Sequence, residues 1–172
     1  MEFFDCLLYV ILLGLLSYPA GRLISRRGPD PERFPFRDWT WEQGGRVYEK
    51  LNIKRWQDRI PDVSRVLGRW MPRKSLKDGF SPDSIRIMIK ETCTAEVVHS
   101  ILSFLGLNLM NIWEGTGGRL VCLIYVLLGN LPFIIVQRYN RPRLKKMLES
   151  LQERERRQAE SELLGREDGS CC

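Results

Sequence analysis

Three apolar blocks, separated by charged intervals, constrain the fold of this chain more than any other feature. The blocks cover residues 3–24, 95–113 and 120–136. Each approaches the roughly 20 residues that a helix needs to cross about 30 Å of hydrocarbon. Because a bilayer offers no water to unpaired backbone groups, an apolar segment of this length crosses it as a helix. The sequence therefore predicts an all-α membrane protein with three transmembrane helices.

The charged intervals divide the chain into six segments with different environments. In chain order these are residues 1–24 (first transmembrane helix), 25–90 (cytoplasmic segment at the membrane surface), 91–113 (helix entering the second span), 114–119 (outer turn), 120–136 (third transmembrane helix) and 137–172 (cytoplasmic basic motif and charged helical tail). The first block begins with Glu2 and Asp5 rather than with basic residues, and no A-x-A site follows it. A retained anchor is therefore favoured over a cleaved signal peptide.

Basic residues give the orientation of the spans. Arg22, Arg26 and Arg27 follow the first block, and a second basic cluster follows the third. Positive charge gathers on the cytoplasmic side, so both clusters predict an N-terminus outside and a C-terminus in the cytoplasm. The net charge of +6 resides beside the apolar blocks. Membrane lipids are therefore the expected partners, and nucleic acid is set aside.

The segment between the first two spans is predicted to lie along the membrane surface, because Trp and Tyr alternate there with Arg and Lys. A short interfacial helix is expected over residues 46–60, followed by a loop through Pro61 and Pro72. Ser81-Pro82-Asp83 is typical of the start of the next helix. The tail from Arg143 onward is interpreted as a solvated charged helix, with partner contact as the alternative.

A polar stripe opens the second span. Thr92, Glu96, His99 and Ser103 follow helical spacing and share one face, and Glu91 lies beside it. Polar groups facing hydrocarbon are costly, so the stripe is expected to face other helices or water. Glu96 is three residues before His99 and can orient the imidazole as a general base. This pattern favours Glu91, Glu96 and His99 as candidate catalytic residues.

Alternative roles for the stripe remain open. Glu96 and His99 can join helices, or Glu91 and Glu96 can form ion pairs with Arg138 and Arg141. A metal site or a metal-dependent oxidase is disfavoured, because His99 is the only histidine and the five cysteines lack metal-type spacing. No metal and no bound cofactor are expected.

A second cluster follows the third span. Its candidate substrate-binding residues are Gln137, Arg138, Tyr139, Asn140 and Arg141. The two arginines can clamp a phosphate or carboxylate, and the amide and phenol groups can donate to an oxygen that gains charge during acyl transfer. Within the third span, Pro132 removes a backbone donor and predicts a kink.

At these residues the chain resembles the glycosyl-4,4'-diaponeurosporenoate acyltransferase family, the CrtO-type enzymes. The resemblance rests on the sequence stretches 36–42, 91–99 and 130–132, and most specifically on residues 137–144. Thr94 and Ser100 depart from the pattern. The resemblance implies transfer of a fatty acyl group to a sugar hydroxyl on a membrane-embedded glycosylated carotenoid, at the plasma membrane.

Two hypotheses of different class follow. In the first, His99, supported by Glu96, deprotonates the hydroxyl of a lipid-embedded glycosylated acceptor, and acyl-CoA or acyl-carrier protein is the acyl donor. In the second, the chain is a noncatalytic scaffold that gathers lipid or carotenoid biosynthetic enzymes as partners. Cys171 and Cys172 are candidates for lipidation, with a frayed terminus as the alternative.

Overall fold

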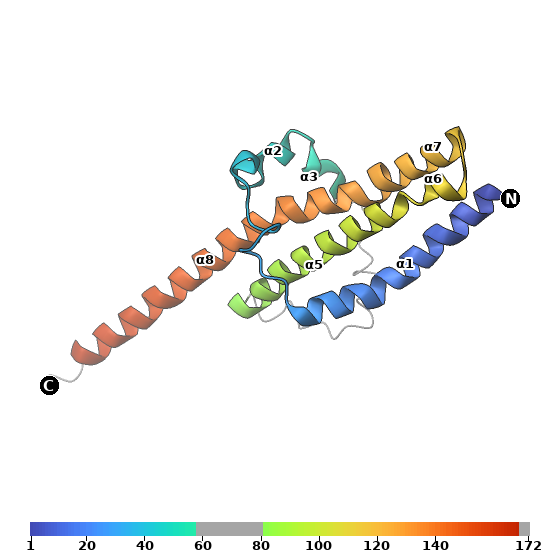
Figure 1. The fold of residues 1–172 in the computed structure, drawn as a ribbon. Coiled ribbons are helices and arrows are strands. Elements are labelled where there is room, and N and C mark those ends of the chain that lie inside the picture. The colour runs from blue at the N-terminus through green and yellow to red at the C-terminus, as the bar shows by residue number, and fades with distance from the viewer. Residues whose placement is uncertain (58–80, 169–172) are drawn as a thin grey trace.

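The computed structural model describes residues 1–57 and 81–168, and within them it contains helices and no strand (Figure 1). The elements in chain order are α1 (Glu2–Arg27), η1 (Thr40–Gly45), α2 (Arg46–Glu49), α3 (Ile53–Trp56), α5 (Pro82–Gly106), α6 (Leu109–Ile112), α7 (Thr116–Ile124), η4 (Tyr125–Asn130) and α8 (Leu131–Asp168). Three helical stretches are long and apolar enough to span a membrane: Glu2–Arg27, Pro82–Ile112 and Thr116–Leu163. The prediction of an all-α chain with three such helices is confirmed.

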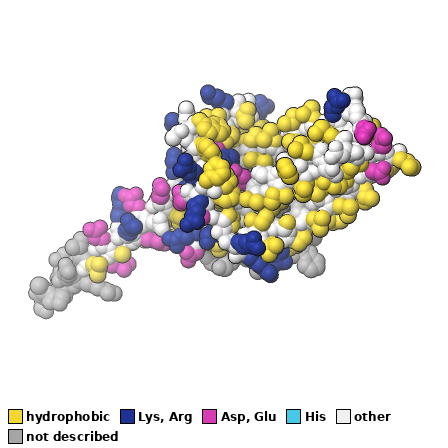
Figure 2. All heavy atoms as spheres, in the orientation of Figure 1, with side chains coloured by type: hydrophobic (Ala, Val, Ile, Leu, Met, Phe, Trp, Pro, Cys, Tyr) yellow, Lys and Arg dark blue, Asp and Glu magenta, His cyan; other side chains and the backbone are white. Residues whose placement is uncertain are grey.

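The surface of the bundle is apolar where a bilayer would cover it. Along α1, large side chains such as Leu8, Leu15 and Leu16 are exposed, and Figure 2 shows hydrophobic side chains spread over this end of the molecule. Charged side chains gather instead where α8 leaves the bundle. α1 ends at Arg27 and is capped by Gly28, which adopts a left-handed conformation with φ of 60°.

Helix α5 lies at the centre of the bundle, between α1 and α8 (Figure 1). It begins at the predicted signal: the Ser84 N–H donates to the Ser81 side chain at 3.2 Å, and Pro82 occupies the first turn, where its missing N–H costs nothing. The helix then runs without a break to Gly106. Polar residues of the second span are thus held on one continuous helix that faces α8.

The third span is one long helix with a wide turn in it. α7 starts at Thr116, inside the interval expected to be the outer turn, and passes into α8 through the π-helical turn η4. Pro132 lacks an N–H and its ring collides with the carbonyl four residues earlier, so a wider turn just before it relieves both problems. The Asn130 side-chain amide donates to the Tyr125 carbonyl at 3.0 Å, which satisfies a carbonyl in the widened turn.

The surface segment folds against α8 rather than forming the single helix expected over residues 46–60. Asn52 adopts a left-handed conformation with φ of 52°, and this divides the segment into α2 and α3. Tyr48 and Ile53 from these short helices bury themselves against Tyr139 of α8. The end of the expected helix, the loop through Pro61 and Pro72, and the two C-terminal cysteines lie outside the described residues.

Gly106 provides a test of the packing between α5 and the wide turn. A Cβ atom there would lie 2.5 Å from the Tyr125 ring, whereas Gly14 on α1 has open space around it. We expect Gly106→Ala to lower stability by about 1–3 kcal/mol, because the ring must be displaced. Gly14→Ala, the matched control, should be neutral or stabilising. Thermal unfolding in detergent measures both, and equal midpoints for the two variants would contradict this packing.

Candidate active site

Glu96 of α5 joins the two polar clusters that the sequence singled out. Its side chain is 6 % exposed. One carboxylate oxygen accepts a hydrogen bond from Arg138 Nη1 at 2.6 Å, and the other accepts one from Arg141 Nη2. The ion-pair alternative is therefore what the structure shows for Glu96. Because α5 and α8 both contribute charged groups, the pairing fixes their relative rotation and depth.

Arg138 extends this pairing to the surface segment. Its guanidinium donates two hydrogen bonds to the Glu42 carboxylate of η1, from Nε to Oε1 at 2.5 Å and from Nη2 to Oε2 at 2.9 Å. Nη1 also donates to the Pro35 carbonyl at 3.1 Å. Parallel contacts of this kind combine charge attraction with a fixed geometry. Arg138 therefore ties three separate segments of the chain together.

Arg141 is the most deeply buried charged residue described, with 1 % of its surface exposed. Nε donates to the Thr92 hydroxyl at 2.9 Å and Nη1 to the Phe36 carbonyl at 2.7 Å, while Nη2 binds Glu96. Its three side-chain nitrogens are thus all bonded within the protein. We call Glu42, Glu96, Arg138 and Arg141 the buried charge network. It contains two positive and two negative side chains.

The environment of Glu42 favours its ionised form. Burial alone raises the pKa of this carboxyl, but hydrogen bonds from Arg138, from the Tyr48 hydroxyl and from the Trp39 N–H outweigh burial and bring the pKa below its ordinary value of 4.5. Burial, followed by the hydrogen bond to the Glu42 carboxylate, raises the pKa of Tyr48. Tyr48 therefore acts as a neutral donor to a charged acceptor.

His99 has a different partner from the one expected. Its Nδ1 lies 3.0 Å from Asn130 Oδ1, and its ring stacks on Phe133 with centroids 4.4 Å apart. Because the Asn130 amide nitrogen already donates to the Tyr125 carbonyl, the Asn130 oxygen is the atom left to accept from Nδ1. The proton of a neutral imidazole then sits on Nδ1, and Nε2 carries the lone pair. Asn130 thus fixes the tautomer of the imidazole, the role that the sequence analysis gave to Glu96.

The remaining candidate residues occupy varied positions. Glu91 is exposed on α5, outside the buried charge network. Gln137 and Asn140 are half-buried on α8, and within the described residues their side chains have no hydrogen-bond partner. Tyr139 is fully buried, and its hydroxyl has no hydrogen-bond partner within the described part of the chain. The guanidinium carbon of Arg143 lies over its ring, 3.5 Å from the ring centroid.

Two residues of the site were not singled out for it from the sequence. Glu42 is the carboxylate that pairs with Arg138. It also accepts a hydrogen bond from the Trp39 N–H at 2.9 Å, but Trp39 lacks the hydroxyl of a capping box, so no local sequence signal marks Glu42. Asn130 belongs to the stretch 130–132 that supports the family resemblance, but no role was assigned to it from the sequence. Across residues 1–57 and 81–168, no group of three or more His, Cys, Asp or Glu side chains is placed to hold a metal ion.

Comparison with known proteins gives one consistent result. Residues 31–150 match the sequence model of a family described as glycosyl-4,4'-diaponeurosporenoate acyltransferase. Proteins of that name from Staphylococcus aureus strains bovine RF122 / ET3-1 and USA300 are each 32% identical to the chain over 155 residues, which cover 88% of this chain and 90% of the relative. No solved structure shows a significant match.

Removing the charge of Glu96 tests the buried charge network. We expect Glu96→Gln to lower the free energy of unfolding by about 3–5 kcal/mol, because a buried arginine loses its counter-charge. Glu153→Gln is the control, since its ion pair with Arg157 is largely exposed, and its unfolding midpoint should be unchanged. Denaturant titration in detergent micelles measures both. A Glu96→Gln variant as stable as the wild type would disprove the structural role of the network.

Acid should weaken the network through Glu42. Its pKa is lowered in the folded state, so the stabilisation from its ionised form is complete above about pH 4.5 and is lost as pH falls through the folded-state pKa. The difference in melting temperature between the wild type and Glu42→Gln should therefore shrink on acidification below pH 4.5. Melting curves of both proteins across a pH series measure this difference, which would stay constant if Glu42 were not ionised in the fold.

Proposed function

The chain belongs to the glycosyl-4,4'-diaponeurosporenoate acyltransferase family, and from this premise we propose that it esterifies a sugar hydroxyl of a membrane-embedded glycosylated carotenoid, or of a similar glycolipid, with a fatty acyl group. The single observation that carries the proposal is the extent of the match. The matched residues, 31–150, include the whole buried charge network as well as His99 and Asn130.

The reaction takes place at the plasma membrane, on its cytoplasmic side. The three apolar helices support membrane insertion, and the basic residues after the first and third spans support a cytoplasmic location for η1 and the tail of α8. His99 then lies about one helical turn past the start of the second apolar block, which begins at residue 95. An acceptor anchored in lipid and an acyl donor from the cytoplasm, acyl-CoA or acyl-carrier protein, can both reach that depth.

His99 is the general base. With its Nδ1 proton held by Asn130, Nε2 takes the proton of the acceptor hydroxyl while the hydroxyl oxygen attacks the carbonyl carbon of the donor thioester. The new C–O bond forms, the C–S bond breaks, and the proton on Nε2 passes to the leaving thiolate. The products are an ester and a free thiol, so the imidazole returns to its starting state. Stacking on Phe133 limits rotation of the ring.

Other residues of the site support this step without receiving the proton. The side-chain amides of Gln137 and Asn140 lie on the helix that carries Phe133, and we assign to them stabilisation of the oxygen that gains negative charge. The buried charge network serves to position α5 against α8, since the arginine nitrogens are bonded to Glu42, Glu96 and Thr92 and to backbone carbonyls. Glu91 has no step in this mechanism.

Loss of the imidazole tests both the activity and the role of His99. In cells that carry the glycosylated acceptor, we expect the wild-type chain to produce an acyl ester that lipid mass spectrometry detects. With His99→Ala the rate of ester formation should fall by about 10²–10⁴-fold, because general-base catalysis contributes that much. The neighbouring Ser100→Ala variant, which removes only a hydroxyl bonded to the Glu96 backbone carbonyl of the same helix, should retain the ester.

Asn130→Ala separates the base from the group that orients it. We expect a smaller loss of rate than with His99→Ala, together with a changed dependence of rate on pH, because the imidazole keeps Nε2 but loses its fixed tautomer. An ester that formed equally well with His99→Ala would exclude His99 as the base. Absence of any new ester with the wild-type chain would exclude the proposed reaction.

A further inference from the structure

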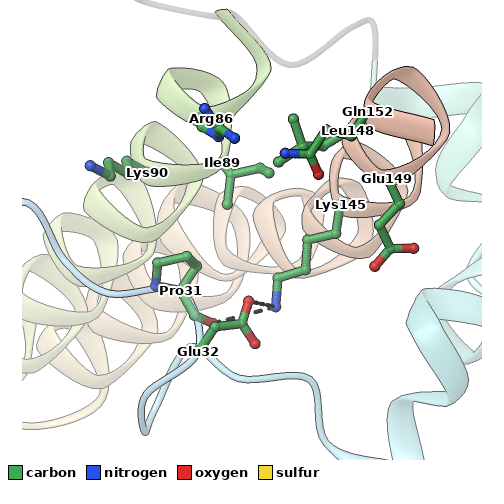
Figure 3. Close-up of a pocket in the computed structure, with 9 residues that line it drawn as sticks. All are labelled: Pro31, Glu32, Arg86, Ile89, Lys90, Lys145, Leu148, Glu149 and Gln152. Atoms are coloured by element: carbon green, nitrogen blue, oxygen red, sulfur yellow. Dashed lines mark hydrogen bonds and ion pairs between the residues drawn. The ribbon is translucent and has the colours of Figure 1, made fainter. Parts of the chain in front are cut away.

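A cleft of about 330 Å³ opens between the first turns of α5 and the part of α8 that follows the buried charge network. Figure 3 shows its walls: side chains of α5 on one side, side chains of α8 opposite them, and the loop after α1 at one end. Its lining includes Glu32, Arg86, Ile89, Lys90, Lys145 and Glu149. This volume is at the small end of ligand pockets and suits a head group rather than a whole lipid.

Basic side chains from both helices line the cleft. Arg86 and Lys90 are four residues apart and share one face of α5, and Lys145 stands on α8. These three cations exceed the two carboxylates in the lining. Lys145 is already held by Glu32 at 2.9 Å, by Asp38 at 3.6 Å and by the Pro31 carbonyl at 3.4 Å, so its charge is compensated within the protein.

The α5 wall retains binding capacity. Arg86 has one partner, Asp83, in an exposed pair that solvent weakens, and Lys90 has no ion-pair partner within the described residues. Ile89 lies between them and is 4 % exposed, so the floor beneath the cations is apolar. A cationic rim above an apolar floor fits an anionic head group attached to a less polar arm.

The site of acyl transfer requires such a group nearby. The donors of Arg138 and Arg141, which were expected to hold a substrate phosphate, are bonded within the protein. Lys90 precedes His99 by nine residues on the same unbroken helix, which corresponds to a rise of about 14 Å. That separation places the cleft at the cytoplasmic end of α5, with the imidazole deeper in the bundle.

We propose that this cleft binds the phosphate end of the acyl donor, the phosphopantetheine phosphate that acyl-CoA and acyl-carrier protein share, through Arg86 and Lys90. The inference rests on the proposed function, since it concerns the donor of the same reaction. Pantetheine then extends along the bundle and presents its thioester at His99, while Lys145 keeps the opposite wall in place.

Binding of coenzyme A, which carries no acyl group, tests the cleft independently of catalysis. The full-length protein is placed in nanodiscs of neutral phosphatidylcholine, and calorimetry measures its affinity for coenzyme A, 4'-phosphopantetheine and unphosphorylated pantetheine. We expect the first two to bind and pantetheine to bind about tenfold or more weakly, because it lacks the charge-assisted contacts. The double variant Arg86→Gln, Lys90→Gln should bind coenzyme A weaker than the wild type by a similar factor.

Two further variants make the result specific. Arg154→Gln with Arg156→Gln removes two exposed charges from α8 outside the cleft and should leave the affinity unchanged. Arg86→Lys with Lys90→Arg keeps both charges and should retain binding. Melting curves establish that each variant is folded, which is expected because Arg86 and Lys90 are both exposed.

The outcomes separate this inference from the proposed function. If the Arg86→Gln, Lys90→Gln variant binds coenzyme A as tightly as the wild type, the proposal that the cleft binds the donor is wrong, even if the ester forms in cells. Loss of bound phosphatidylglycerol from that variant in native mass spectrometry, with coenzyme A affinity intact, assigns the cleft to a lipid head group and also overturns it. Charge-dependent binding of coenzyme A without any ester supports the cleft and rejects the reaction.

Discussion

The pairing of two arginines of α8 with two carboxylates, one on α5 and one on η1, is the interaction on which the rest of the structure depends. Isolated burial of any one of these charges would be prohibitive, so each is tolerated only while its partners stay in place. Arg138 contacts Glu42 and Glu96, and Arg141 contacts Glu96, so a shift of any one segment leaves a charge exposed to an apolar neighbourhood. Between helices whose apolar faces would slide against one another in lipid, this requirement sets a unique depth and rotation. The position of His99 opposite Asn130 follows from it.

Much of the fold is predictable because a bilayer imposes strong rules on sequence. Apolar length identifies the three long helices, and Ser81-Pro82-Asp83 marks the start of α5. The spacing of Thr92, Glu96 and His99 shows that they share a face, and the cost of polar groups in hydrocarbon shows that this face must turn inward. The structure places all three of these side chains against α8 or groups bonded to it.

Pairwise partners are harder to predict, since several acceptors compete for the same donor. From spacing alone Glu96 can serve His99 or an arginine, and only the three-dimensional arrangement assigns it to both arginines and leaves the imidazole to Asn130. Glu42 lies 96 residues from Arg138 along the chain, in a segment where many charged residues alternate with aromatic ones. No local pattern distinguishes it from an exposed carboxylate. The division of the surface segment at Asn52 has a similar cause, because contact with Tyr139 overrides the local preference for one continuous helix.

The wide turn at Tyr125–Asn130 determines which direction each side chain of α8 faces around the helix axis. A π-helical turn is equivalent to an α-helical turn with one residue inserted, and one residue corresponds to about 100° of rotation around the axis. Shortening this turn by a single residue would leave the apolar character of the span intact, yet it would swing Arg138 and Arg141 about a quarter of a circle away from α5. The mean hydropathy of the helix would not register such a change, but Arg138 and Arg141 would lose their contacts with Glu42 and Glu96. Through this one added residue, the turn before Pro132 specifies where the side chains of Arg138 and Arg141 point.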